Sequence, residues 1–331
     1  MQSSSELFPV ALISAELRGD LSEDVYRLKP GTAPDFSVEL AVTRLGLAGQ
    51  QERGQPVILL HGSFSNRRFW YSPRAIGLGP HLARAGFDVW IAEMRGHGLS
   101  PRNQAYKHNS VAEYARYDLP AIAAFVREQS GQVPHWVGHS LGGITLAAAL
   151  GGGYLDESSA ASAALFGSQI SRVYWPLKVP PLEWGSRLLL RGFPHISGTR
   201  FKRGPEDEPI GVALESLRWH RLFGRFGDAE RDWWAGMADV TVPLLAVSAT
   251  GDLQDPAWAC RKLYDQFISA PRSFLLLGKD KGYSSDFGHI EMLVSKEAQT
   301  EVWPLVEHWL RELGLPPEKR QDEVTSALAC G

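Results

Sequence analysis

The sequence has only two cysteines in 331 residues, Cys260 and Cys330. Two thiols cannot build a disulfide framework or a four-ligand metal site, which fits a reducing compartment. Long apolar runs are also missing, since no stretch reaches the ~18 apolar residues of a membrane span. The first ten residues lack a basic segment followed by an apolar stretch, so we expect no secretion signal. These absences together predict a soluble, cytoplasmic protein.

An excess of positive charge is missing too. Thirty-four Lys and Arg face 37 Asp and Glu, a net charge of −3, and no basic block stands out, which argues against a nucleic-acid partner. No H-E-x-x-H or paired Cys/His spacing occurs, so no metal is expected. Neither G-x-G-x-x-G after the first strands nor G-x-x-x-x-G-K-[ST] is present, so nucleotide chemistry lacks a site. We expect no cofactor, a small-molecule partner and no integral membrane segment, and leave a homodimer open.

What the chain does have is enough apolar material for a large core: 44% hydrophobic, 10% aromatic and 21% charged residues. Short apolar runs bounded by Gly, Pro and polar residues indicate buried strands. They are 56–61, 87–92, 134–138, 163–166, 243–248 and 273–277. Helical spacing appears between them, at 111–128, 141–150, about 258–267 and 299–313. This alternation predicts an α/β fold, a mostly parallel central sheet with helices on both faces.

One region interrupts the alternation. Residues 171–239 show no clear strand but contain five tryptophans, with 11 basic and nine acidic residues. We interpret this region as an inserted helical cap on a discontinuous core made of 1–170 and 240–315, with a flexible tail at 316–331. Most cap aromatics are expected to form the cap's own core. A minority are expected to line an apolar pocket with neighbouring core residues. The pocket candidates are Phe64, Trp175, Trp184, Trp219 and Ile290.

The segment Gly138-His-Ser140-Leu-Gly142 carries the pattern G-x-S-x-G. On a strand-to-helix turn this pattern holds a serine in a strained conformation with its hydroxyl accessible. The pattern alone is weak, but an apolar run precedes Ser140 and an Ala-rich helical stretch follows it. Ser140 is therefore the candidate nucleophile.

A serine attacking an acyl carbon creates a negative oxygen, which preorganised backbone N–H groups stabilise. The amide of Leu141 follows the nucleophile and opens the helix, so it is the first candidate donor. The second should follow an earlier strand, and His61-Gly62-Ser63-Phe64 supplies a strand end, a glycine and a free amide. We favour Ser63 over Phe64 as that donor.

Neutral serine needs an imidazole base, and the imidazole needs a carboxylate to orient it. In a strand-turn-helix architecture the partners follow the serine in the order acid, then base, each on a loop after a later strand. Asp252 follows the run ending at Ser248, and we favour it over Asp255, which precedes a proline. His289 follows a glycine in the loop after Leu277 and is the candidate base. His308 lies within the last amphipathic helix and is a weaker choice.

Three further features resemble catalytic motifs but favour structural roles. His61 stands at a strand end, and His139 lies beside the nucleophile; both are expected to pack and to form hydrogen bonds. In Arg95-Gly96-His97 the arginine and histidine are expected to brace neighbouring loops.

These residues together resemble the α/β-hydrolase superfamily over about residues 38–313. Four segments resemble its acid-lipase branch, which includes gastric and lysosomal lipases: 86–90 leading into Arg95-Gly96, 117–121, 252–256 and 286–291. The resemblance implies Ser140, Asp252 and His289 as the catalytic triad and Leu141 as an oxyanion donor. The chain departs from the branch in its Leu-Gly-Gly elbow, a shorter acid segment and a shorter cap. The resemblance therefore implies the fold and the triad, but no preference for triglycerides.

The expected activity is hydrolysis of carboxylic esters through an acyl-serine, with an apolar acyl or aromatic group under the cap. The same triad would also serve an acyltransferase, a thioesterase or a C–C hydrolase. A non-catalytic ligand-binding homologue is a further alternative. Haloalkane dehalogenase and epoxide hydrolase chemistry requires a carboxylate nucleophile, whereas this chain has Ser140.

Overall fold

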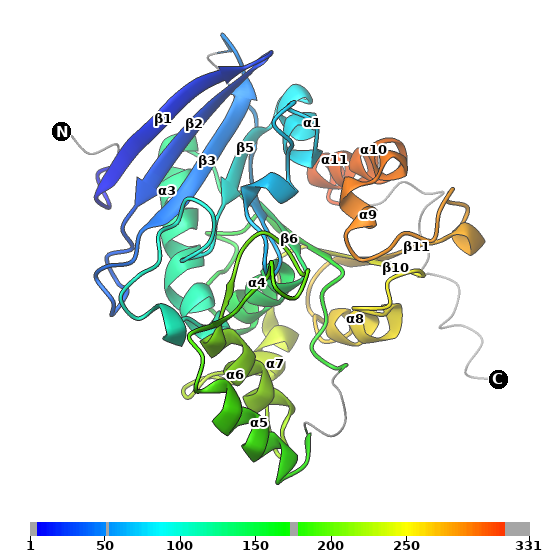
Figure 1. The fold of residues 1–331 in the computed structure, drawn as a ribbon. Helices are drawn as coiled ribbons and strands as arrows, with labels where there is room; N and C mark the ends of the chain where they lie inside the picture. Colours follow the sequence, from blue (N-terminus) through cyan, green and yellow to red (C-terminus); the bar gives the residue numbers. More distant parts are fainter. Residues whose placement is uncertain (1–4, 51–52, 173–177, 315–331) are drawn as a thin grey trace.

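The computed structural model describes residues 5–50, 53–172 and 178–314. Its centre is a nine-stranded sheet in the order β1-β2-β3-β5-β4-β6-β7-β10-β11 (Figure 1). The strands are β1 Val10–Arg18, β2 Leu21–Leu28, β3 Leu40–Leu47, β4 Pro56–Leu60, β5 Asp88–Ala92, β6 His135–His139, β7 Ser162–Phe166, β10 Leu244–Ala249 and β11 Arg272–Leu277. The six from β5 to β11 pair in parallel, and β1, β2 and β3 join antiparallel at one edge.

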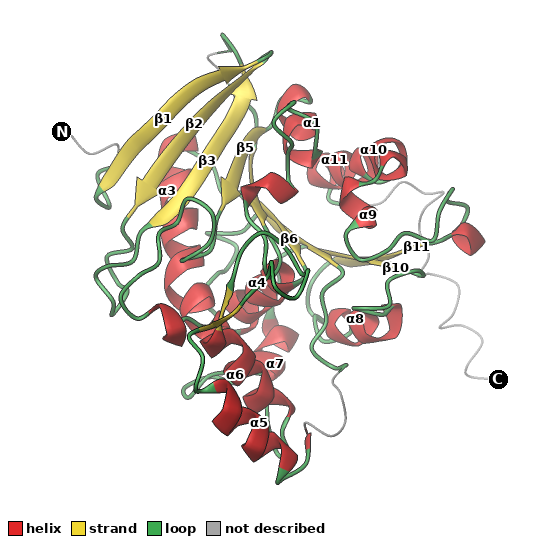
Figure 2. Cartoon of the chain, in the orientation of Figure 1, coloured by secondary structure: helices red, strands yellow, loops and turns green. Residues whose placement is uncertain are grey.

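All six predicted apolar runs are strands, and each predicted helical stretch is helical, which confirms the predicted α/β architecture. The helices are α1 Leu78–Arg84, α2 Val111–Glu113, α3 Leu119–Ser130, α4 Leu141–Gly151, α5 Leu182–Leu190, α6 Ile210–His220, α7 Trp233–Gly236, α8 Ala257–Tyr264, α9 Glu291–Val294, α10 Lys296–Glu301 and α11 Trp303–Glu312 (Figure 2). A π-helical turn, Tyr114–Asp118, joins α2 to α3. Sequence analysis did not predict β1–β3, whose side chains are partly exposed and give no continuous apolar run.

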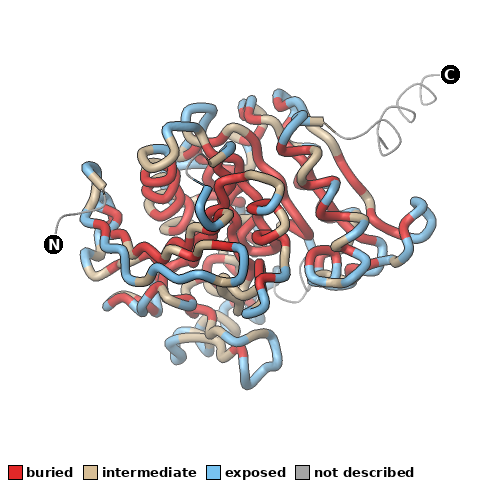
Figure 3. The backbone as a smooth tube through the Cα atoms, turned by 90° about the horizontal axis from the view of Figure 1, so that it is seen from above, coloured by how far each residue is buried: buried red, intermediate tan, exposed pale blue. Residues whose placement is uncertain are grey.

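Helices cover both faces of the sheet, and successive side chains of a central strand pack into opposite layers. Along β4, Ile58 and Leu60 pack into the core shared with α3, α4 and α8, while Val57 and Leu59 pack into the core shared with α1 and α11. This period of two is the alternation of side chains along a strand, and both faces are covered, so the strand is apolar throughout. Buried backbone accordingly fills the middle of the molecule (Figure 3).

The chain between β7 and β10 leaves the sheet. Within this connection, residues 178–239 contain α5, α6, α7 and a short hairpin of β8 His195–Ile196 with β9 Glu208–Pro209. We call this part the insertion. Its helices α5 and α6 lie farthest from the sheet (Figure 1), and α7 packs against the end of α4. The hairpin is a small correction to the prediction of a region without strands; two residues per strand are too few to give a pattern.

Within the described residues, no helix is both long enough and apolar enough to cross a bilayer. The predicted tail, 316–331, lies outside the described residues.

Candidate active site

Ser140 occupies a sharp turn between β6 and α4. Its backbone has φ 52° and ψ −119°, a conformation that costs a non-glycine residue about 1–3 kcal/mol. Two glycines permit the turn: a Cβ at Gly138 would lie 2.7 Å from the Cα of Gly143, and a Cβ at Gly142 would collide with the carbonyl oxygen of Leu60. The spacing of G-x-S-x-G is thus a requirement of packing at this site.

Ser140 lines a cavity of about 310 Å³ at the carboxyl ends of the parallel strands. This is where open parallel sheets bind ligands. Segments far apart in the chain form its wall: residues 62–65, Phe69, His139, Ser140, residues 203–205, Gln254, His289 and Ile290.

His289 is held by Asp252. The Nδ1 of the imidazole lies 2.8 Å from Oδ2 of the carboxylate, whose other oxygen accepts the backbone N–H groups of Gln254 (2.9 Å) and Asp255 (2.8 Å). Because the partner of Nδ1 is a carboxylate, we assign the proton of the neutral ring to Nδ1. Nε2 then keeps its lone pair, as a general base needs.

Ser140 and His289 line the same cavity. Among the described residues, no hydrogen bond yet joins the Ser140 hydroxyl to the imidazole. Such bonds are often long without substrate and tighten when it binds.

Asp255, the alternative acid, lies on the other edge of the imidazole. Its Oδ2 is 3.9 Å from Nε2 of His289, and its Oδ1 accepts a hydrogen bond from Gln169 Nε2 (3.0 Å). Burial raises the pKa of Asp255 to about 6. The Nδ1 position therefore belongs to Asp252, in line with the choice made from sequence.

The two candidate oxyanion amides flank the nucleophile. Leu141 is the first residue of α4, and a Cβ on Gly62 would lie 3.0 Å from Ser140 Cβ, so the loop that carries Ser63 approaches the nucleophile closely. In the described part of the chain, neither amide donates to another residue. The Phe64 amide, by contrast, donates to Glu208 Oε2 at 3.0 Å. This geometry favours Ser63 over Phe64.

His61 orients the peptide that contains the Ser63 amide. Its Nδ1 donates to the carbonyl of Gly62 (2.8 Å), while Nε2 accepts the N–H of Met94 (3.2 Å). Burial lowers the pKa of His61 to about 3, so the ring is neutral and can do both. Because a trans peptide points its C=O and N–H in opposite directions, this bond directs the Ser63 N–H away from His61.

The remaining motif residues have the predicted structural roles. His139 Nε2 donates to the carbonyl of His289 (2.9 Å), and its ring stacks on Phe69 at 4.5 Å. Burial lowers the pKa of His139 to about 3. Arg95 forms two hydrogen bonds to Asp118, the last residue of the π-helical turn before α3, and thus ties the loop after β5 to this helical segment rather than to a second loop.

Only some of the residues predicted to line the pocket do so. Phe64 and Ile290 line the cavity. Trp184 and Trp219 do not, which corrects that expectation: Trp184 is 64% exposed on α5, and Trp219 is 8% exposed. Trp219 packs against Phe226 and Trp233 in the insertion's own aromatic cluster. Trp175 lies outside the described residues. Helical spacing alone could not tell these environments apart.

Sequence analysis missed the insertion residues that cover the cavity, Arg203, Gly204 and Pro205, and the buried Glu208 beside them. They stand about 140 positions after the loop they contact, in a segment without periodicity. Nothing in the sequence pairs the two segments. In the part of the chain that the structure describes, no group of three or more His, Cys, Asp or Glu could hold a metal ion.

Parts of this sequence are similar to known proteins. A family model described as alpha/beta hydrolase fold matches residues 55–174. Lipase member N of Mus musculus is 37% identical over 117 residues, which are 31% of this chain and 29% of that protein. Gastric triacylglycerol lipase of Homo sapiens is 39% identical over 122 residues, 34% of this chain and 31% of that protein. The chain thus matches less than a third of the length of either relative.

Among solved structures, a thermophilic esterase from Thermogutta terrifontis superposes with a TM-score of 0.57. It is 18% identical, and the superposition covers 87% of this chain and 98% of that one. At such identity the likeness concerns the fold alone.

Proposed function

We propose that this chain, which has the α/β-hydrolase fold with lipase-like segments, hydrolyses carboxylic esters through an acyl-serine formed on Ser140. One arrangement carries the proposal. A buried carboxylate holds His289 through Nδ1 at 2.8 Å, in a cavity shared with a serine on a strained turn. The base then has its orienting acid, and the candidate nucleophile lines the same cavity as the base.

In the first half-reaction, His289 Nε2 takes the proton of the Ser140 hydroxyl as Oγ bonds to the ester carbonyl carbon. The carbonyl oxygen becomes negative and accepts hydrogen bonds from the amides of Leu141 and Ser63. Asp252 stabilises the imidazolium. The C–O bond to the alcohol then breaks, and the alcohol leaves with the proton from His289.

In the second half-reaction, His289 takes a proton from water as the water oxygen attacks the acyl carbon. The acyl–Oγ bond breaks, Ser140 regains its proton from His289, and the carboxylic acid leaves. No cofactor enters either step.

The substrate is proposed to carry a compact apolar acyl or aromatic group. Phe64, Phe69, Pro205 and Ile290 line the cavity, whose volume of about 310 Å³ is at the small end for ligand pockets. The insertion, which supplies Pro205, is proposed to act as a cap over this group. The cytoplasmic location and the homodimer stay predictions.

The test combines labelling and turnover. A fluorophosphonate probe should label the purified protein at Ser140, identified by peptide mass spectrometry, and short-chain or aryl p-nitrophenyl esters should be cleaved. Ser140→Ala should lose both. Labelling at another residue, or a panel without turnover, would contradict the proposal. Adding a competing alcohol or a thioester to the panel separates hydrolysis from acyl transfer and thioester cleavage.

A further inference from the structure

Insertion residues bind the loop after β4 at both backbone polar groups of one residue, Phe64. The N–H of Phe64 donates to Glu208 Oε2 at 3.0 Å, and the carbonyl of Phe64 accepts the N–H of Glu206 at 3.0 Å. Asn66 Nδ2 donates to Glu206 Oε1 at 2.5 Å. A Cβ at Gly204 would collide with the carbonyl oxygen of Phe64, so the two backbones are in close contact. We call these contacts the loop clamp.

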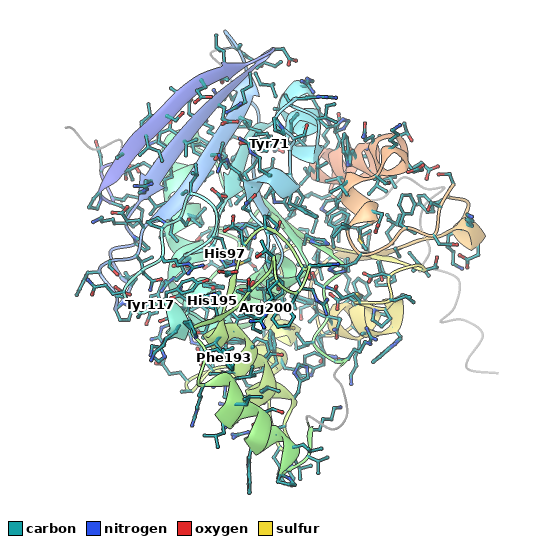
Figure 4. The ribbon with its side chains drawn as sticks, in the orientation of Figure 1. Tyr71, His97, Tyr117, Phe193, His195 and Arg200 are labelled. Carbon is teal, nitrogen blue, oxygen red and sulfur yellow. The ribbon has the colours of Figure 1, made fainter. Side chains whose placement is uncertain are left out.

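Glu208 is a costly residue at this place. It is 3% exposed, and a buried carboxylate must be paired or hydrogen-bonded to be tolerated. Its partners are the Phe64 amide and His97, whose Nε2 lies 3.4 Å from Oε2. Burial lowers the pKa of His97, but the Glu208 carboxylate outweighs this effect, so that the pKa is raised overall. Figure 4 labels His97 and His195, and His195 belongs to β8, the strand that pairs with Glu208–Pro209.

Phe64, the residue that these contacts hold, directly follows Ser63, whose amide is the candidate oxyanion donor. Phe64 has φ 59°, which a phenylalanine rarely adopts and which the surrounding contacts must hold in place. The Phe64 N–H donates a hydrogen bond to Glu208, and the Gly62 carbonyl accepts one from His61. The Ser63 amide lies between these two fixed points.

We infer that Glu208 is a positioning residue: through the Phe64 amide it fixes the loop so that the Ser63 amide is ready to receive the negative oxygen. The inference rests on the proposed function. It makes the insertion part of the oxyanion machinery, because the loop is correctly held only while Glu208 is docked. A preorganised donor accelerates the reaction because it needs no rearrangement as the charge develops.

The test replaces the carboxylate in two ways. Glu208→Ala removes the acceptor and should lower kcat by roughly 30- to 100-fold with little change in KM, since a displaced donor affects the transition state alone. Glu208→Gln keeps an acceptor oxygen of the same reach and should recover kcat to within about threefold of the wild type. The inhibition constant of phenylboronic acid, whose serine adduct carries an oxygen in the oxyanion position, should rise in parallel with the loss of kcat.

If Glu208→Ala does not fold, Gly204→Ala takes its place as the test variant. Its added methyl pushes the insertion off the Phe64 carbonyl without changing charge, and it should also lower kcat, by ~10-fold or more. Glu230→Ala is the matched control, because Glu230 is an exposed insertion acid paired with Arg116, away from the loop. It should leave kcat and the boronate constant unchanged.

Hydrogen exchange gives a readout independent of turnover. Amides of residues 61–66 should exchange faster in Glu208→Ala than in the wild type and in Glu230→Ala. Full kcat and boronate affinity in both Glu208→Ala and Gly204→Ala, in an active wild type, would overturn the inference and leave the proposed function standing. A wild type with neither ester turnover nor fluorophosphonate labelling would overturn both.

Discussion

The Oδ2 of Asp255 lies 3.9 Å from the Nε2 of His289, on the opposite edge of the imidazole from Asp252. The proposed base thus stands between two carboxylates. Asp252 holds the ring in its working tautomer. Asp255 faces the nitrogen that must accept the serine proton, and burial raises its pKa to about 6. Near neutral pH Asp255 therefore places a negative charge beside that nitrogen.

Removing that charge should extend activity to lower pH. In Asp255→Asn, the acid limb of the kcat/KM profile should move down by up to about one pH unit, because the variant carries no negative charge beside Nε2 of the imidazole. The Asn oxygen can still accept from Gln169. Asp280→Asn removes the same charge from the exposed start of the His289 loop and should leave the limb in place. An unmoved or raised limb in Asp255→Asn would show that Asp255 does not act on the base.

The turn at Ser140 predicts a trade of stability for reactivity. Ser140→Ala should lose ~10⁶ in rate, since removing a triad member typically costs that much. Ser140→Gly should be equally inactive but more stable than Ser140→Ala by ~1 kcal/mol, because only glycine adopts φ 52°, ψ −119° freely. Urea unfolding of the two variants measures the difference. Equal midpoints would mean that the backbone there is unstrained.

Glu215 on α6 predicts a pH-dependent stability. Its Oε2 accepts the Ala112 amide at 3.2 Å, and burial raises its pKa from 4.5 to about 7, although Arg218 opposes this. Between pH 4.5 and 7 the unfolded chain ionises this group while the folded chain keeps the proton, so its contribution to stability falls with rising pH and levels off above 7.

The stability of Glu215→Gln relative to that of the wild type should therefore increase as pH rises. The gain at pH 8 should be on the order of 1–3 kcal/mol relative to pH 4.5, measured by urea unfolding at both pH values. Glu230→Gln, an exposed insertion acid, should show no such trend. A gain that is the same at both pH values would mean that folding does not raise the pKa of Glu215.

Trp184 and Trp219, the two described pocket candidates that do not line the cavity, should differ sharply in their effect on stability. Trp219→Ala empties a buried aromatic cluster and should destabilise the protein by about 3–5 kcal/mol. Trp184→Ala removes a side chain that is 64% exposed and should change stability by less than ~0.5 kcal/mol. Chemical denaturation measures both. An altered ester preference in Trp184→Ala would return that residue to the pocket.

Much of the scaffold was readable from local patterns. The six parallel strands are largely buried on both faces, so their apolar runs were continuous, and α3 lies within the predicted helical stretch 111–128 except for its last two residues. The antiparallel β1–β3 were missed because charged residues such as Glu16, Asp24 and Arg44 interrupt them, so none gives a continuous apolar run. Trp184 and Trp219 were placed wrongly because both stand on helices of similar composition, and only packing buries one of them.

By itself the sequence determined the turn around Ser140 and the order in which Ser140, Asp252 and His289 follow their strands, because glycine sterics and strand ends are local. The tertiary structure alone decided that Glu208 holds the Phe64 amide and that Asp255 faces Nε2. Those pairs depend on how loops from distant strands meet at one edge of the sheet. No local periodicity encodes that meeting, since it arises only when the burial of the whole core brings the strand ends together.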